Sequence, residues 1–184
     1  MKYFRKENLG KTITLISFVL GSILVGLYYF TEKAELLFIG YIFIVLIVIL
    51  NIAVFIASIV EAIKNKPLRK KLITNSAIML LNIPIAYLYL WFMMILLNTI
   101  RLTLVNSTDS NLTDLNISGC ESKLIDELKA GESKTIWISI SNDCSVFLKF
   151  KEDDIEKTET IIGYASNMSG QKAKHIIGQG NQEL

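Results

Sequence analysis

Three long uncharged segments and one polar segment divide this chain. The uncharged segments run from Thr12 to Phe30 (19 residues), from Leu36 to Val60 (25 residues) and from Leu72 to Ile100 (29 residues). About 20 apolar helical residues cross a hydrocarbon core that is about 30 Å thick. A helix in a soluble protein is seldom apolar on every face over such a length. The pattern therefore predicts three transmembrane helices.

The chain becomes polar after the third apolar segment, and apolar side chains then recur at every second position. KTIWISIS (residues 134–141) and SVFLKFK (145–151) alternate in this way, as half-buried antiparallel strands do. We predict that the two strands form a hairpin with a loop at residues 142–144. In that register Trp137 lies opposite Lys149 on the outer face.

The outer face of this predicted hairpin is the candidate contact surface of the chain. Trp137, Phe147 and Lys149 share it in the predicted register, and exposed aromatic side chains often anchor protein interfaces. The alternative is that another strand covers this face, so that the aromatic side chains only stabilise the fold.

Short alternating segments elsewhere in the polar part predict further strands. They lie at residues 101–106, 112–118, 155–164 and 172–177, with a short strand or turn within 124–133. Six or seven short strands in about 80 residues are typical of a small β-sandwich, here loosely immunoglobulin-like. The predicted parts are a three-helix transmembrane anchor (1–100), an all-β sandwich domain (101–178) and a flexible tail (179–184).

Positive charge is concentrated on one side of the predicted membrane. The stretch KNKPLRKK joins the second and third apolar segments and contains Lys64, Lys66, Arg69, Lys70 and Lys71. The N-terminal flank adds Lys2, Arg5, Lys6 and Lys11, whereas the two opposite flanks contain only Lys33 and Arg101. Short cytoplasmic loops are rich in Lys and Arg. The bias of nine to two predicts a cytoplasmic N-terminus, a cytoplasmic basic loop at 64–71 and an extracytoplasmic all-β domain.

A role in topology is sufficient to explain the basic loop at 64–71. A contact with anionic lipids or with a partner protein is the alternative, and it does not exclude the first role. No aromatic or folded basic module accompanies the charge, so the sequence gives no indication of nucleic-acid binding.

Composition bears on the host compartment. Frequent Ile, Lys and Asn residues are typical of chains from AT-rich bacterial genomes, which favours a bacterial inner membrane and a periplasmic all-β domain. In a eukaryotic secretory protein, N-x-S/T triplets would be glycan acceptors. Four such triplets occur, at Asn106, Asn111, Asn116 and Asn167.

The three apolar segments contain no ionisable Asp, Glu, Lys, Arg or His, which argues against an ion or proton path formed by this chain alone. Asn51 and Asn82 are each expected to hydrogen-bond to a neighbouring helix, and Pro84 should kink the third helix. Gly21 and Gly26 belong to pairs of small residues spaced four apart, which permits close helix approach. We expect all five residues to serve contacts within the three-helix unit; contacts with another subunit are the alternative.

Residues that would indicate an enzyme are scarce. His175 is the one histidine, and the chain has no nucleophile elbow, P-loop or metal-ligand motif. The carboxylates of DELKAGE and KEDDIEK are typical of a solvated face. We therefore predict a non-catalytic protein without a cofactor, a bound metal or a small-molecule substrate.

Both cysteines, Cys120 and Cys144, fall in the polar part of the chain. The predicted extracytoplasmic location permits a disulfide. Cys144 lies in the predicted hairpin loop and Cys120 lies just past the strand that ends near Ser118, so both would occupy the same end of the sandwich. We predict a disulfide that encloses about 25 residues. Two separate thiols are the alternative.

These features favour a membrane protein whose partners are lipids and other membrane or periplasmic proteins. The leading hypothesis is an accessory or scaffolding subunit of an inner-membrane assembly of the secretion, motor or transport type. Its periplasmic domain would serve protein contact. A second hypothesis is an immunity-type or regulatory protein that binds a toxin or enzyme at the membrane. A third is a periplasmic ligand sensor.

Overall fold

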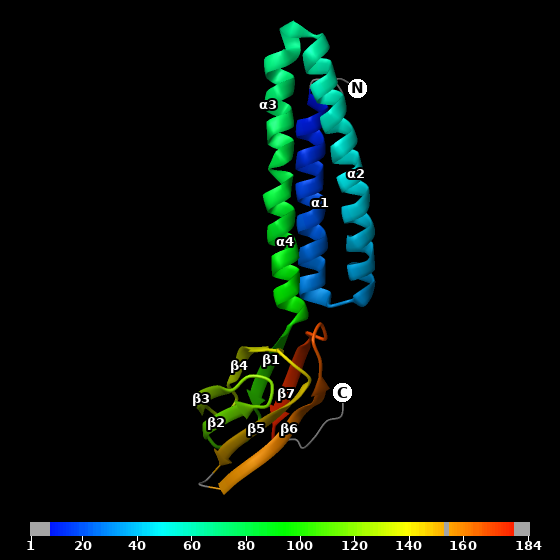
Figure 1. Cartoon of the computed structure of the whole chain (residues 1–184). Coiled ribbons are helices and arrows are strands. Elements are labelled where there is room, and N and C mark those ends of the chain that lie inside the picture. Colours follow the sequence, from blue (N-terminus) through cyan, green and yellow to red (C-terminus); the bar gives the residue numbers. More distant parts are fainter. Residues whose placement is uncertain (1–7, 153–154, 179–184) are drawn as a thin grey trace. The chain divides into compact units, whose positions relative to one another are not determined.

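The computed structural model describes residues 8–152 and 155–178 (Figure 1). The chain divides into two compact units, with the boundary between Met93 and Met94. We call them the helical unit and the β unit. Two predicted features lie outside the described residues: the tail at 179–184 and the cations Lys2, Arg5 and Lys6.

Long apolar helices form the helical unit (Figure 1). They are α1 (Leu9–Thr31), α2 (Ala34–Lys64), the short 3-10 helix η2 (Lys66–Leu68), α3 (Arg69–Leu80) and α4 (Asn82–Leu97), whose last turn belongs to the β unit. Because η2, α3 and α4 follow one another directly, the described residues contain three spans that are long and apolar enough to cross a membrane. The prediction of three long apolar helices is confirmed.

The third span is interrupted at Leu81, between α3 and α4. Pro84 lies in the first turn of α4. In a continuous helix, the carbonyl of Leu80 would accept a hydrogen bond from residue 84. Proline has no N–H to donate, and its ring would clash with that carbonyl. The N–H of Leu81 donates instead to the carbonyl of Ile78, at 3.1 Å. The distortion expected from Pro84 thus falls three residues before the proline.

Small side chains line the buried face of α1. Gly10, Thr14, Ser17 and Gly21 are buried, and their spacings of three and four place them on one side of the helix. A Cβ atom at Gly10 would lie 2.7 Å from Sδ of Met79 in α3. The missing side chain therefore lets α1 and α3 approach closely, as small residues do between apolar helices.

Seven strands form the β unit in the described residues (Figure 1). They are β1 (Thr99–Asn106), β2 (Leu112–Ser118), β3 (Lys123–Leu128), β4 (Ser133–Ser139), β5 (Cys144–Glu152), β6 (Ile155–Ala165) and β7 (Lys172–Ile177). One sheet has the order β4–β1–β7 and the other β3–β2–β5–β6. Neighbouring strands are antiparallel except β1 and β7, which are parallel. The strands predicted from the alternating pattern are present.

Apolar side chains from both sheets form one buried cluster. Leu102 of β1 and Ile138 of β4 come from the first sheet, and Ile117 of β2 and Leu148 of β5 come from the second. All four side chains are fully buried. Burial of one such side chain stabilises the fold by about 1.5–3 kcal/mol. The faces that the alternating pattern predicted as apolar are thus the faces that form the core.

The predicted hairpin between residues 134–141 and 145–151 is wrong. β4 pairs with β1, whereas β5 pairs with β2 and β6, so the two strands belong to different sheets. A period-two pattern indicates which face of a strand is buried, but it does not indicate the neighbouring strand. Two strands can turn their apolar faces to the same core from different sheets. Trp137 consequently lies opposite Arg101 and not opposite Lys149.

Candidate functional site

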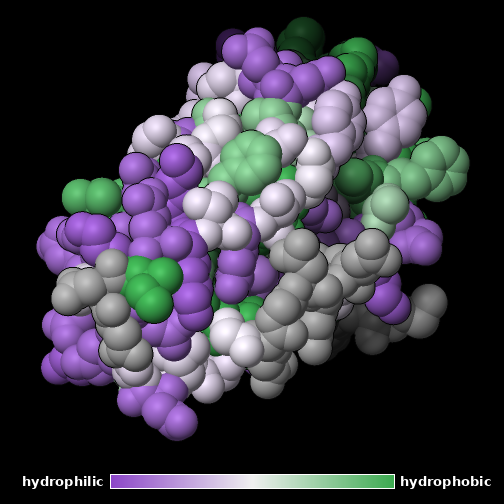
Figure 2. Space-filling view, turned by 90° about the horizontal axis from the view of Figure 1, so that it is seen from below, coloured by the Kyte–Doolittle hydropathy of each residue, from purple (hydrophilic) through white to green (hydrophobic). Residues whose placement is uncertain are grey.

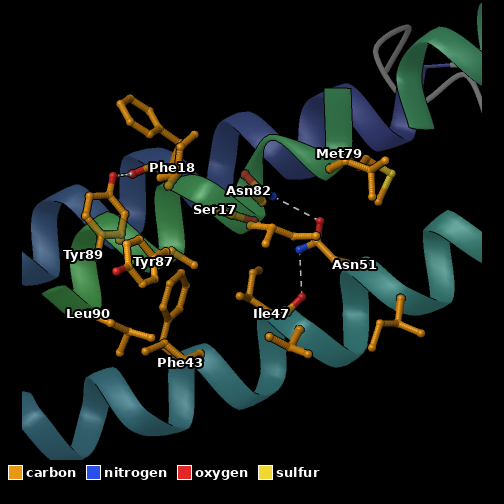
Figure 3. A pocket seen from close by; sticks show the side chains of 18 of the residues that line it. Ser17, Phe18, Phe43, Ile47, Asn51, Met79, Asn82, Tyr87, Tyr89 and Leu90 are labelled. Carbon is orange, nitrogen blue, oxygen red and sulfur yellow. Dashed lines mark hydrogen bonds between the residues drawn. The ribbon is translucent and has the colours of Figure 1, made fainter. Parts of the chain in front are cut away.

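The helical unit contains an apolar pocket of about 560 Å³ (Figure 3). α2 and α4 supply most of its lining, including Phe43 and Leu90, and α1 contributes Phe18 and Gly21. No Asp, Glu, Lys, Arg or His of the described chain lines it. The pocket therefore suits an apolar occupant and offers no charged group for catalysis.

A hydrogen bond between two asparagines joins α2 to α4 at this pocket. Asn82 Nδ2 donates to Asn51 Oδ1 at 3.2 Å, and Asn51 Nδ2 donates to the carbonyl of Ile47 at 2.8 Å (Figure 3). The second bond sets the orientation of the Asn51 amide, and this in turn sets that of Asn82. Each asparagine was expected to bond to a neighbouring helix, and the structure pairs them with each other.

Tyr89 packs α4 against α1 where Gly21 leaves room for its ring. A Cβ atom at Gly21 would lie 2.9 Å from Cε2 of Tyr89. The hydroxyl group of Tyr89 donates to the carbonyl of Phe18 at 3.2 Å and lies 2.6 Å from Oγ of Ser22. Gly21 thus lies at a close helix contact, as its spacing predicted.

Gly26 does not make the helix contact that its spacing predicted. No other described segment places an atom within 4 Å of the position that a Cβ at Gly26 would occupy. One turn further along α1, the rings of Tyr29 and Phe92 stack with centroids 6.3 Å apart. Two rings between helices hold their backbones apart. Small residues permit a close approach, but the side chains of the facing helix determine where it occurs.

The basic loop begins at the end of α2 and continues into α3. Lys66, Arg69 and Lys70 line a shallow groove together with Ile73 and Thr74. These positions follow the spacing of one helical face. The cationic side chains lie at the start of the groove, and the uncharged Ile73 and Thr74 lie toward the body of α3; this order of environments matches a membrane surface.

A disulfide joins Cys120 and Cys144 in the β unit, as the sequence predicted. Cys144 is the first residue of β5, and Cys120 follows β2, which is paired with β5. The Cα atoms of the two cysteines are 5.1 Å apart. The bridge closes one end of a strand pair within a single sheet, so Cys144 is not in a hairpin loop.

Glu121, next to the disulfide, links the two sheets. One carboxylate oxygen accepts from Nζ of Lys123 at 2.7 Å, and the other accepts from the backbone N–H of Ser139, the last residue of β4, at 2.7 Å. These hydrogen bonds, that to Lys123 foremost, hold the pKa of the Glu121 carboxyl below its usual range. Sequence reasoning missed this residue, because nothing in its local pattern distinguishes it from a solvated carboxylate.

Replacing Glu121 by glutamine should lower the free energy of unfolding at neutral pH by about 1 kcal/mol. A hydrogen bond to a charged group contributes about 1.5–3 kcal/mol, and solvent screening reduces this for a side chain that is 34% exposed. Because the folded-state pKa is depressed, the contribution is present above the unfolded pKa of about 4.3 and is lost as the pH falls through the folded value. Urea unfolding from about pH 7 to about pH 3 should show the two proteins converging in acid. A constant difference over this range would contradict the prediction.

The predicted contact surface is divided between the two sheets. Trp137 lies on β4, whereas Phe147 and Lys149 lie on β5, so the three side chains do not share one face. Trp137 is 39% exposed and Phe147 is 38% exposed. Trp137 and Phe147 are thus separate outward aromatic side chains of similar exposure.

Arg101 supports the ring of Trp137. The two residues are opposite each other in the pairing of β1 with β4. The guanidinium carbon of Arg101 lies 5.9 Å from the ring centroid, and Arg101 itself is buried. A cation over a tryptophan ring contributes about 0.5–1 kcal/mol at an exposed site. The contact favours this orientation of the Trp137 ring, whereas the sequence had indicated only a flanking charge at Arg101.

His175 connects the two sheets through a carboxylate. Its Nε2 lies 2.6 Å from Oε2 of Glu159, and both side chains are largely buried. His175 is on β7 and Glu159 is on β6, which belong to different sheets. His175 therefore has a structural role, because its contact with Glu159 joins the two sheets.

Comparison with known proteins does not assign a function to these features. No family model, no curated protein and no solved structure matches the chain. The face in Figure 2 shows hydrophilic and intermediate residues over most of its area, with smaller hydrophobic areas among them. In the part of the chain that the structure describes, no group of three or more His, Cys, Asp or Glu residues could hold a metal ion. The features considered for function are the pocket in the helical unit, the basic loop, and the outward side chains of Trp137 and Phe147.

Proposed function

We propose that the protein is a non-catalytic integral membrane protein whose β unit binds another protein. In this proposal it is an accessory or scaffolding subunit of an assembly in a bacterial inner membrane. The N-terminus and the basic loop at 64–71 are cytoplasmic, and the β unit is periplasmic. Its partners are membrane lipids and other protein subunits.

Exposed apolar side chains on the helices support a membrane location. Leu15 on α1 is 61% exposed, Leu46 on α2 is 62% exposed and Leu88 on α4 is 55% exposed. Apolar surface of this extent is unfavourable in water and is normally covered. Contact with lipid chains removes that cost, so the surface that would aggregate in water becomes the lipid-facing surface in a bilayer.

The disulfide supports the orientation independently of the charge bias. Disulfides form and persist in extracytoplasmic compartments and are rare in the cytosol. The Cys120–Cys144 bridge lies in the β unit, and the counts of Lys and Arg assign the same part of the chain to the extracytoplasmic side. Two unrelated physical arguments therefore lead to one topology.

We further propose that the β unit is a β-sandwich, loosely immunoglobulin-like. Its two sheets share one apolar cluster, and β4 and β5, which are consecutive in the chain, belong to different sheets. Such crossings between sheets are common in sandwiches with Greek-key connections. The sandwich would present the outer faces of both sheets to partners.

The orientation of Trp137 is the observation that carries the proposed protein contact. Tryptophan, tyrosine and arginine are the residues most enriched among those that dominate binding energy. Trp137 is outward-facing and contacts Arg101, and this contact would reduce the side-chain entropy lost on binding. We therefore expect the partner to bind the outer face of the sheet β4–β1–β7.

Photo-crosslinking can test this contact with a matched pair of sites. A photoreactive amino acid at Thr135, two residues from Trp137 on the same face of β4, should capture the partner in native membranes. The same amino acid at Lys149, on the outer face of the other sheet, should not. Trp137→Ala should weaken binding by about 2 kcal/mol, or about thirtyfold, as for a central interface residue. Phe147→Ala is the control, because Phe147 is equally exposed.

Two results would contradict this assignment. One is capture of the partner from Lys149 and not from Thr135. The other is full binding by the Trp137→Ala variant when its disulfide and its unfolding midpoint match those of the wild type. In either case the surface around Trp137 is not the binding surface.

A further inference from the structure

The pocket in the helical unit has the size of a small-ligand site. Its volume of about 560 Å³ lies within the range of about 300–1,000 Å³ that is typical of such sites. A helix about 10 Å wide that rises 1.5 Å per residue fills roughly 120 Å³ per residue. The pocket would therefore hold only about five residues of a partner helix. Its volume suits a slender molecule better than a transmembrane helix.

Asn82, which lines the pocket, has a side-chain acceptor without a donor among the described residues. Because Asn51 Nδ2 donates to Ile47, the atom of Asn51 that accepts from Asn82 Nδ2 is Oδ1. Oδ1 of Asn82 takes no part in this arrangement, and no residue in the described part of the chain donates a hydrogen bond to it. Asn82 lines the pocket and is partly exposed. A hydrocarbon environment contains no water to supply a donor, and a missing hydrogen bond is costly there.

We propose that the pocket binds a free long-chain alcohol dissolved in the membrane. The hydrocarbon chain lies against the apolar side chains of α2 and α4, such as Phe43 and Leu90, and the hydroxyl group donates to Oδ1 of Asn82. This ligand supplies a donor to Oδ1 of Asn82 and requires no charged partner. The inference rests on the proposed membrane location, and it is independent of the protein contact at Trp137.

Competition in vesicles tests the role of the hydroxyl group on the unaltered protein. The full-length chain is reconstituted in phosphatidylcholine vesicles and labelled with a photoreactive, clickable analogue of hexadecanol. Unlabelled hexadecanol and hexadecyl methyl ether are the competitors, and the ether cannot donate a hydrogen bond. We expect saturable labelling of peptides from α2 and α4. The ether should need about fivefold higher concentration to compete, which is the effect of one neutral hydrogen bond.

Three variants locate the site. Asn82→Leu removes the acceptor and should abolish the difference between alcohol and ether. Ala86→Phe fills the pocket, which Ala86 lines, and should remove saturable labelling. Ala53→Phe is the matched control. Ala53 is two residues from both Asn51 and Phe55, so it lies about 200° around α2 from these pocket residues and faces away from the pocket. The Ala53→Phe variant should therefore be labelled like the wild type.

Several results would overturn the proposal. They are absent saturable labelling of the wild type, equal competition by alcohol and ether, persistence of the preference in Asn82→Leu, and unchanged labelling of Ala86→Phe. Membrane association is measured separately, by sedimentation after an alkaline carbonate wash. If the chain stays with the membrane while labelling fails, the alcohol site is wrong and the membrane location is not. If the chain is washed off, both proposals are wrong.

Discussion

Loss of the disulfide between Cys120 and Cys144 should lower the free energy of unfolding of the β unit by about 3 kcal/mol. The two cysteines are 24 residues apart in the chain, and opening a loop of this size restores entropy mainly to the unfolded chain. Domains are stabilised by only about 5–15 kcal/mol in total. The loss would therefore be a large share of the stability of the β unit.

The measurement uses tryptophan fluorescence during urea unfolding of the full-length chain in detergent. The chain has two tryptophans, Trp91 in α4 and Trp137 in the β unit, so a Trp91→Phe background leaves Trp137 as the reporter. Cys120→Ser, Cys144→Ser and the double variant should show the same lower midpoint, because each removes the same bridge. Midpoints equal to that of the oxidised wild type would contradict the prediction.

The backbone around Cys120 makes this bridge possible. Gly119 has a φ of 115°, a conformation that favours glycine. A Cβ atom at Gly119 would lie 1.7 Å from the carbonyl oxygen of Ser145 in β5. The end of β2 can therefore approach β5 closely enough for the two cysteines to bond.

Neutralising the basic loop should destroy the uniform orientation of the chain. If Lys64, Lys66, Arg69, Lys70 and Lys71 are replaced by glutamine, the bias of nine to two falls to four to two. Positive charge in short loops near apolar segments is the main determinant of orientation. We expect a mixed population, in which a substantial fraction of the chains places the β unit in the cytoplasm.

The control removes the same number of positive charges from the β unit. Charges in a long translocated domain have little influence on orientation. Glutamine at Lys129, Lys134, Lys149, Lys172 and Lys174 should therefore leave the orientation unchanged. Equal effects of the two sets, or no effect of the loop set, would show that the basic loop does not determine topology.

The sequence predicted the elements of this fold better than their partners. The uncharged segments marked the long helices, and the strands at Leu112–Ser118 and Lys172–Ile177 begin and end where the alternating pattern predicted. The uncharged run and the alternating pattern are both local signals, because each depends only on the surroundings of one helix or one strand. The same locality explains the wrong hairpin, since Ile138 and Leu148 are buried whether or not their strands are neighbours.

The candidate sites depended on distant contacts and were predicted less well. The polarity of Asn51 and Asn82 indicated helix contacts, but their hydrogen bond to each other depends on how α2 and α4 are packed. Gly21 and Gly26 have the same local signal, yet only Gly21 faces a ring of α4 at close range. The support of Trp137 by Arg101 follows from the strand pairing, which the alternating pattern did not contain.

The side of the membrane on which the C-terminus lies is the most direct test of the central claim. Alkaline phosphatase, which is active only outside the cytoplasm, and a fluorescent protein that is fluorescent only inside it, are each fused after Leu184. The nine-to-two charge bias and the disulfide of the β unit predict an active phosphatase and a dark fluorescent fusion. A fluorescent fusion together with an inactive phosphatase would contradict the topology, and with it the proposed periplasmic binding role.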